Sequence, residues 1–294
     1  MDASLRALRD LQVELPPCPR SLAQLLPLLD DDRAGMAEMA TVVETDMALA
    51  AAVVRTVNSA MFGLLRRVDT VAEAMRHLGT REVAALTYAT ALRGALPSTP
   101  ALDHLWDHAA RAGLLMGRSA PALGLDPWRA HTAGLFAWSG LAVLLAHRPR
   151  QMTPLYLGAF QARALPASAP PQGADAASAA PGDGLPRDEP GLILAEQQAY
   201  GFDHAALGSA LCAAWGLSHE VVHFVHDRLQ PVEGVATRPE TLRRLLCLGR
   251  AVDRLLTGDA LTAVCRELAP GSGWPQQQLE AALAAALGRG LGVA

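Results

Sequence analysis

The stretch GLFAWSGLAVLL, residues 134–145, decides how this chain is interpreted. It carries no charged residue, and the hydroxyl of Ser139 is its only side-chain group suited to metal binding or proton transfer. A helix that is apolar on every face is typical of a buried core element. His131 precedes the stretch, His147 follows it, and Trp138 lies at its centre. Two interpretations are therefore open: an ordinary buried helix, or a catalytic helix that has lost its chemistry.

The composition around this stretch predicts an all-α protein with a large core. Of the 294 residues, 51% are hydrophobic and 4% are aromatic, and alanine and leucine dominate. Alanine and leucine favour helices over sheets. No segment alternates between apolar and polar residues as a half-buried strand does. We expect two packed helical bundles, the first over residues 1–97 and the second over residues 98–294.

Charge and cysteine content exclude several classes of protein. A net charge of −4 argues against a nucleic-acid partner bound by phosphate neutralisation. The uncharged run 132–146 is shorter than the ~20 residues of a membrane helix, and the first ten residues lack an apolar signal core. We therefore expect a cytoplasmic protein with no membrane partner. Scattered cysteines without a CxxC pair are typical of free thiols without a function in a reducing compartment. The four cysteines are Cys18, Cys212, Cys247 and Cys265.

Helix signals run along nearly the whole chain, with one interruption. Thr70 and Glu73 form a capping box, and Asp126 followed by Pro127 is typical of a helix start. Residues 164–191 are instead rich in Ala, Pro, Gly, Ser and Asp. Such a segment buries too little apolar surface to offset the entropy of ordering. We interpret 164–191 as a mobile insertion in the second bundle.

A polar residue falls on the apolar face of the helix predicted within residues 45–63. Asn58 follows Val54 by one turn on that face. A buried amide needs partners, and the nearest are backbone groups at the helix end. We expect Asn58 and Ser59 to brace the turn around Gly63.

Several stretches together resemble the HDOD domain, a bacterial signalling module related to the HD phosphohydrolases. The most specific are NSAMFG, residues 58–63, and GFDHAALG, residues 201–208. The similarity covers most of residues 10–230. It implies that the second bundle is HD-like.

The resemblance also implies that residues 134–145 are a catalytic segment without its metal site. In active HD enzymes, a His-Asp pair binds a divalent metal that activates water. The matching positions here are Ala137 and Trp138, neither of which can bind a metal. A later His-His pair of the cyclic-dinucleotide hydrolases falls at Arg228 and Leu229. We expect Trp138 to fill the space of the lost metal site.

Three ligand-like positions remain at His108, His204 and Asp253. Each also has a structural interpretation: His108 as a hydrogen-bonded core residue, and His204 as part of a first helical turn. Asp253 would then pair with Arg250 or Arg254 on a solvated face. The alternative is a remnant polar pocket that binds a small ligand without metal. We predict that the chain holds no metal and no cofactor.

The sequence HEVVH, residues 219–223, has the residue types of the zinc motif HExxH. His219 and His223 lie one turn apart with Glu220 beside the first. His226 continues the same face, but no third ligand is evident. We interpret the motif as a helix surface that binds metal only adventitiously.

These features predict a non-catalytic signalling module that acts through protein partners. The resemblance suggests two-component or cyclic-dinucleotide regulators on separate chains. A residual phosphohydrolase and a sensor of a nucleotide second messenger stay open as alternatives. Apolar residues beside arginine in a loop are suited to a partner surface. The alternative is that Leu64 and Leu65 pack against the helical bundle while the arginines are solvated. The residues of this candidate surface are Leu64, Leu65, Arg66 and Arg67.

Overall fold

The computed structural model shows a protein whose regular elements are all helical, which confirms the expected all-α fold. The structure describes residues 20–30, 34–58, 66–78, 83, 87, 90, 93–94, 96–161, 189–230 and 232–288, and the elements and contacts are those within these ranges.

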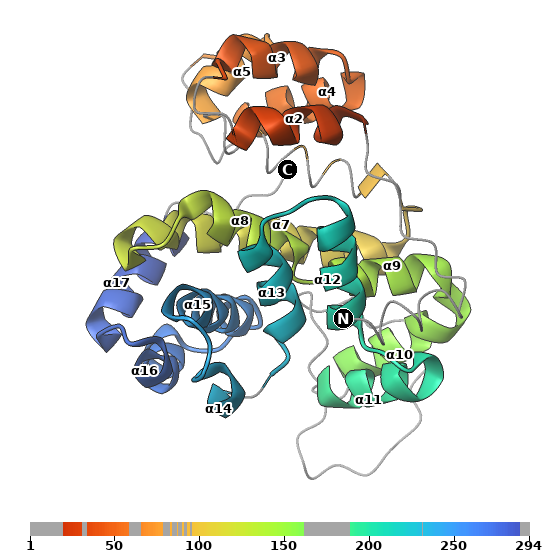
Figure 1. Cartoon of the computed structure of the whole chain (residues 1–294), viewed down its shortest axis with the longest axis vertical. Helices are drawn as coiled ribbons and strands as arrows, with labels where there is room; N and C mark the ends of the chain where they lie inside the picture. Colours follow the sequence, from red (N-terminus) through yellow and green to blue (C-terminus); the bar gives the residue numbers. More distant parts are fainter. Residues whose placement is uncertain are drawn as a thin grey trace.

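Four N-terminal helices lie together at one end of the molecule (Figure 1). They are α2 (Arg20–Asp30), α3 (Met36–Glu44), α4 (Met47–Val57) and α5 (Val71–Leu78). Their buried side chains form a core of their own, which includes Leu25, Val43, Val53, Val57 and Met75.

Polar side chains at the ends of these helices fix their connections. The carboxylate of Asp46 caps α4 by accepting from the Leu49 amide at 3.1 Å, and it accepts from the Ser21 hydroxyl at 3.0 Å. Asn58 donates to the carbonyl of Val68 at 2.6 Å and accepts from the Val68 amide at 2.8 Å. Asn58 thus joins the end of α4 to the residues before α5. Ser59 and Gly63 lie outside the described residues.

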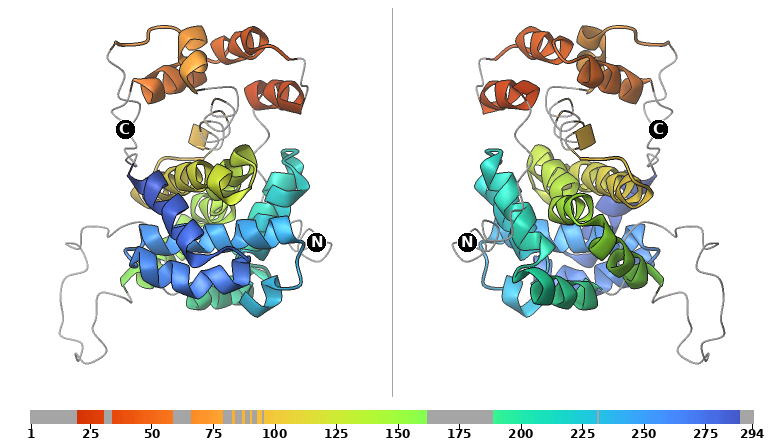
Figure 2. Two further views of the ribbon diagram at one scale, coloured as in Figure 1. Left: turned by 90° about the vertical axis from the view of Figure 1, so that its left-hand side faces the viewer. Right: turned by 90° about the vertical axis from the view of Figure 1, so that its right-hand side faces the viewer.

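The remaining helices surround a second core around α7 (Pro100–Ser119), which contacts α8, α9, α15 and α17 (Figures 1 and 2). Residues 96–99 precede α7 without regular structure, and the proposed bundle boundary at residue 97 stays a prediction. The other elements are η1 (Ala120–Leu123), α8 (Pro127–Phe136), α9 (Ser139–His147), α10 (Pro149–Gln161), α11 (Glu189–Tyr200), α12 (His204–Ala214), α13 (His219–Asp227), α14 (Val232–Val235), α15 (Glu240–Leu256), α16 (Leu261–Ser272) and α17 (Gln276–Leu287).

The apolar stretch 134–145 is not one continuous helix. α8 ends at Phe136, α9 begins at Ser139, and Ala137 and Trp138 form the turn between them. All twelve residues of the stretch are buried. By length and composition, the segment Pro127–His147, which spans α8 and α9, is long and apolar enough to cross a membrane. However, 89% of its apolar window is buried inside the protein.

Glycines allow the helices around this turn to approach closely. A methyl group at Gly140 of α9 would collide with the carbonyl oxygen of His204 and lie 2.5 Å from the amide nitrogen of Gly208, both on α12. A methyl group at Gly134 of α8 would lie 2.8 Å from the amide nitrogen of Gly113 on α7. Backbone therefore packs on backbone at both contacts, which leaves no room for a side chain.

The predicted insertion ends earlier than expected. α11 begins at Glu189, so residues 189–191 are helical and the expectation of irregular structure there is wrong. Pro190 is compatible with a first helical turn, because amides in that turn have no intrahelical acceptor. Residues 162–188 lie outside the described residues.

Candidate functional site

Residues from four segments of the chain meet at Trp138. The imidazole of His204 stacks on the indole, with ring centroids 5.5 Å apart and planes 17° apart. The ring of His108 meets the indole edge-on at 6.3 Å. The guanidinium carbon of Arg228 lies 3.6 Å from the centroid of the indole. Trp138 is only 3% exposed, so it fills the centre of this cluster.

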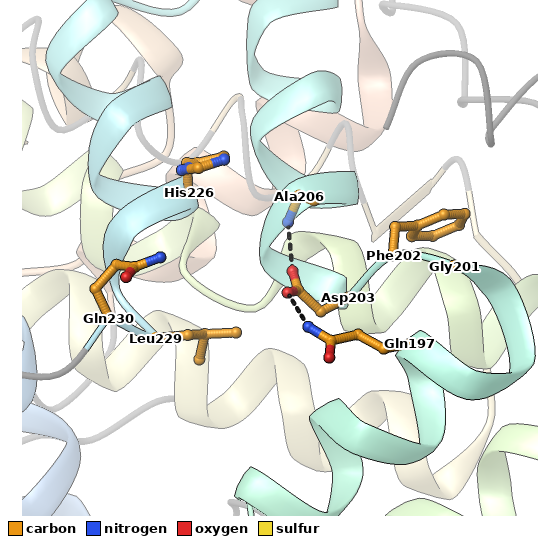
Figure 3. A pocket seen from close by; sticks show the side chains of 8 residues that line it. All are labelled: Gln197, Gly201, Phe202, Asp203, Ala206, His226, Leu229 and Gln230. Atoms are coloured by element: carbon orange, nitrogen blue, oxygen red, sulfur yellow. Dashed lines mark hydrogen bonds between the residues drawn. The ribbon is translucent and has the colours of Figure 1, made fainter. Parts of the chain in front are cut away.

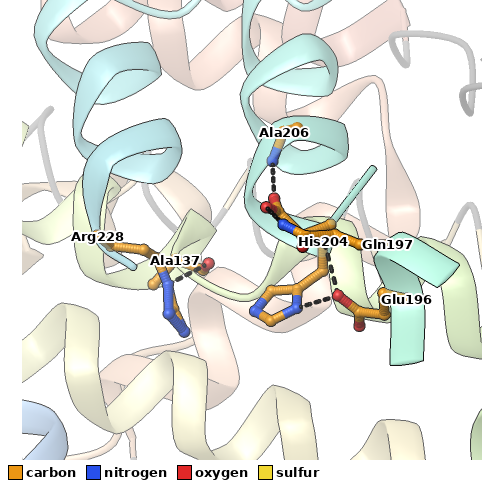
Figure 4. Close-up of polar contacts among 7 residues, drawn as sticks. Ala137, Glu196, Gln197, His204, Ala206 and Arg228 are labelled. Carbon is orange, nitrogen blue, oxygen red and sulfur yellow. Dashed lines mark hydrogen bonds and ion pairs between the residues drawn. The ribbon is translucent and has the colours of Figure 1, made fainter. Parts of the chain in front are cut away.

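Arg228 places a fixed positive charge at the cluster. It follows the end of α13, and its Nε donates to the carbonyl oxygen of Ala137 at 3.0 Å (Figure 4). Arg228 is 9% exposed, and a guanidinium over an indole gains cation–π energy, which is larger when water is excluded. A buried guanidinium also repels a divalent cation in the same space.

His108 and Asp253 join α7 to α15. His108 Nε2 lies 3.1 Å from Oδ1 of Asp253, and the His108 side chain is buried while Asp253 is partly exposed. The expected pairing of Asp253 with Arg250 or Arg254 is wrong. Arg254 pairs with acidic residues further along the chain, and Arg250 donates to a backbone carbonyl. Asp253 pairs with the His108 imidazole rather than with an arginine because the imidazole is buried beside it, and a buried polar ring needs a partner.

The second imidazole of the cluster pairs with a residue that the sequence analysis missed. Glu196 of α11 is fully buried, and its Oε2 lies 2.8 Å from Nδ1 and 2.9 Å from the backbone nitrogen of His204 (Figure 4). Leu192, Glu196 and Tyr200 are all buried and follow one another at a spacing of four. A lone acid on an otherwise apolar helix face was therefore the signal, because buried carboxylates have a partner.

The donor set of this cluster does not fit a divalent metal. In the described part of the chain, no three His, Cys, Asp or Glu residues are grouped so that they could hold a metal ion. Each imidazole uses one ring nitrogen on a carboxylate, Trp138 contacts both rings, and Arg228 lies over the indole. These contacts pack the rings together and place a carboxylate beside each imidazole.

The HEVVH segment is a surface feature of α13. His219 and His223 are exposed. Glu220 accepts from the guanidinium of Arg129 at 3.0 Å, which joins α13 to α8. Among the described residues, these side chains do not form a group of three that could hold a metal ion.

The remaining predicted positions are not part of the Trp138 cluster. Leu229 lines an open pocket between α11, α12 and α13 (Figure 3). Arg66 and Arg67 are exposed and lie just before Val68, which Asn58 holds. Leu64 and Leu65 lie outside the described residues.

Comparisons with known proteins agree with this fold. The structure is similar to that of a protein from Shewanella amazonensis provisionally described as a phosphohydrolase, with 21% identity, a TM-score of 0.70, and coverage of 97% of this chain and 96% of that one. It is similar to a protein from Marinobacter aquaeolei provisionally described as a signal transduction protein, with 23% identity, a TM-score of 0.66, and coverage of 94% of this chain and 58% of that one.

An HDOD domain protein of unknown function from Geobacter sulfurreducens shares 18% identity with a TM-score of 0.67, over 97% of this chain and 95% of that one. A comparison with curated proteins found no match. The sequence profile of the HDOD domain matches residues 15–165. Because that match covers more than half of the 294 residues, the chain belongs to the HDOD domain family.

Proposed function

We propose that this chain is a non-catalytic signalling module in which an indole and a guanidinium have replaced the HD metal site. One observation carries the proposal: the Arg228 guanidinium lies 3.6 Å from the centre of the Trp138 ring. Trp138 stands at the position that the resemblance assigns to a metal-binding aspartate. The pair therefore removes a ligand and adds a positive charge, and both changes oppose metal binding.

The pairing of the two remaining histidines supports the same proposal. His108 is held by Asp253 and His204 by Glu196. In an HD hydrolase these imidazoles would face a metal, whereas here each is tied to a carboxylate. Removing either partner would leave a buried polar ring unsatisfied, which costs about 1–3 kcal/mol. The contribution of His108 and His204 to stability is thus enough to explain why both are present, without a catalytic role.

Hydrolysis of phosphodiesters tests the absence of catalysis. The purified chain should hydrolyse neither a generic phosphodiester nor a cyclic dinucleotide, with or without added Mn²⁺. His104→Ala is the matched control for His108→Ala, because His104 lies one turn earlier on α7 and is only partly buried. Hydrolysis that survives purification, persists in His104→Ala and is lost in His108→Ala would contradict the proposal and favour a residual phosphohydrolase.

The function then depends on a protein partner. We propose a cytoplasmic partner of the two-component or cyclic-dinucleotide type on a separate chain, and the surface around Arg66 and Arg67 as its docking site. Arginine is enriched in interfaces, and loops carry recognition. Both arginines are exposed, and the Asn58–Val68 bonds hold the backbone that follows them.

A charge reversal tests this surface. Arg66→Glu combined with Arg67→Glu should leave the melting temperature nearly unchanged, because exposed substitutions usually change stability by less than about 0.5 kcal/mol. It should abolish recovery of the native partner in a pull-down. Arg111→Glu combined with Arg266→Glu is the control, since both are exposed arginines on other helices. Equal recovery with both double variants would exclude the Arg66–Arg67 surface.

A further inference from the structure

A pocket of about 450 Å³ opens between α11, α12 and α13, beside the Trp138 cluster (Figure 3). Its volume lies in the range of small-ligand sites, roughly 300–1,000 Å³. Asp203 and Gln197 lie on one side, and His226 and Gln230 on the other. The complete lining is Gln197, Gly201, Phe202, Asp203, Ala206, His226, Leu229 and Gln230.

On one wall, existing hydrogen bonds fix which groups face a ligand. Asp203 caps α12: its Oδ1 accepts from the Ala206 amide at 2.9 Å, and its Oδ2 accepts from Nε2 of Gln197 at 3.2 Å. A carboxylate oxygen has two acceptor sites, so Asp203 keeps capacity on both oxygens. Because Gln197 uses its amide nitrogen on Asp203, its carbonyl oxygen is the group left for a ligand. This wall therefore offers acceptors and one negative charge.

The opposite wall also presents an acceptor. His226 Nδ1 lies 2.9 Å from Oδ1 of Asp227, which is 1% exposed and also paired with Arg238 through contacts of 3.0 Å to each oxygen. A carboxylate in this position accepts, so Nδ1 of His226 donates the hydrogen bond. In the neutral ring, Nε2 then carries a lone pair. The His226 side chain is 44% exposed, so this lone pair is available to a ligand.

The charge balance of the pocket disfavours an anionic ligand. No Lys or Arg is among the lining residues, and Asp203 contributes a negative charge. Arg238 is engaged by Asp227, and Arg250 donates to the carbonyl of Gln230. A phosphate here would meet a carboxylate without a compensating cation. A bare metal ion does not fit either, because the described residues include no group of three metal-binding side chains.

We infer that this pocket binds the guanidinium of an arginine side chain presented by a partner polypeptide. A guanidinium is cationic and carries five N–H donors in one plane, which complements acceptors on two facing walls. The pocket is larger than one side chain needs, and the amides of Gln197 and Gln230 can bond to peptide groups. The choice of a protein as the source of the guanidinium rests on the proposed function, whereas the preference for a guanidinium does not.

Calorimetric titration of the full chain tests the inference with three probes. N-acetyl-arginine N-methylamide represents a peptide arginine, its citrulline analogue is a nearly isosteric neutral control, and agmatine represents a free guanidine. The arginine peptide mimic should bind in roughly the millimolar range expected for a small ligand. The citrulline analogue should bind at least about 10-fold more weakly, because charged hydrogen bonds are the stronger ones.

Two variants remove acceptors without removing structure. Asp203→Asn deletes the charge, and asparagine caps a helix as well as aspartate does. His226→Asn keeps a donor toward Asp227 and deletes the Nε2 lone pair. Each should weaken binding by about 10- to 100-fold with a nearly unchanged melting temperature. His223→Asn is the matched control, because His223 is exposed one turn earlier on α13 and does not line the pocket; it should bind like the wild type.

Three results would overturn the inference. The first is that the arginine mimic does not bind at tens of millimolar, which is roughly the weakest affinity such a site would have. The second is that the citrulline analogue binds as tightly as the arginine mimic. The third is that both pocket variants bind the arginine mimic as tightly as the wild type does. Binding of agmatine without the capped arginine would overturn the choice of a polypeptide. None of these results depends on phosphodiester hydrolysis, so this inference and the proposed absence of catalysis fail separately.

Discussion

The contact between α9 and α12 at Gly140 gives the sharpest stability prediction. In Gly140→Ala, the new methyl group would collide with the His204 carbonyl oxygen and approach the Gly208 amide nitrogen to 2.5 Å. Both obstacles are backbone, so no rotamer change can relieve them. The helices must separate, and His204 would shift on the indole of Trp138.

The expected loss follows from two opposing effects. Overpacking costs about 1–3 kcal/mol and occasionally more, and backbone obstacles place this site at the upper end. Alanine gains about 1 kcal/mol over glycine in helix propensity. The net loss should be about 2 kcal/mol or more, which lowers the melting temperature by about 4–8 °C in a domain of roughly this size. Thermal unfolding followed by far-UV circular dichroism measures it.

Gly94→Ala is the matched control with the opposite sign. Gly94 is helical and exposed, and a methyl group there meets nothing within 4 Å. This variant should raise stability by about 0.5–1 kcal/mol. A Gly140→Ala protein as stable as the wild type would refute the close contact of α9 and α12.

Three further predictions concern the core, pH and the unplaced segment. Trp138→Ala should cost about 3–5 kcal/mol in urea unfolding, as for other buried aromatic truncations, and a loss below about 1 kcal/mol would mean that Trp138 does not fill the cluster. Burial, with a smaller effect from Arg118, lowers the pKa of His131 from 6.5 to about 4. Between those values the unfolded chain binds a proton that the folded chain does not, so stability is complete above about pH 6.5 and falls by roughly 3 kcal/mol toward pH 4. His131→Asn should lose this part of the slope when unfolding is compared at about pH 7 and about pH 4.5, and an unchanged slope would contradict burial of a neutral ring. Deletion of residues 168–188 should leave the melting temperature nearly unchanged, because their composition offers little apolar surface to a core, whereas a loss of several degrees would show that they pack on the protein.

Local signals in the sequence were enough for the fold and for the helix starts. Asp126 caps α8, as the sequence predicted, because a cap depends on residues only two or three positions away. The break at Ala137–Trp138 was missed, since apolar periodicity does not distinguish one buried helix from two joined by a tight turn.

The contacts of the candidate site depend on residues far apart in the chain. Asp253 and His108 are separated by 145 positions, so their hydrogen bond has no local signature, and a pairing with a neighbouring arginine was the simpler expectation. Family resemblance brought His108 and Trp138 into one site, whereas Glu196 has no counterpart in the motifs that carry the resemblance. The partner of Glu196 is His204, which the structure places beside it because α11 lies next to the start of α12.

Metal content tests the central claim most directly. Untagged protein would be dialysed against a chelator, exposed to Mn²⁺, Fe²⁺ or Zn²⁺, desalted and measured by elemental mass spectrometry. A site filled by Trp138 and Arg228 predicts far less than one metal per chain, with no difference between the wild type and His108→Ala. One tightly held Mn²⁺ or Fe²⁺ per chain that is lost in His108→Ala would contradict the account, and stoichiometric zinc lost in His219→Ala would instead restore the HEVVH segment as a metal site.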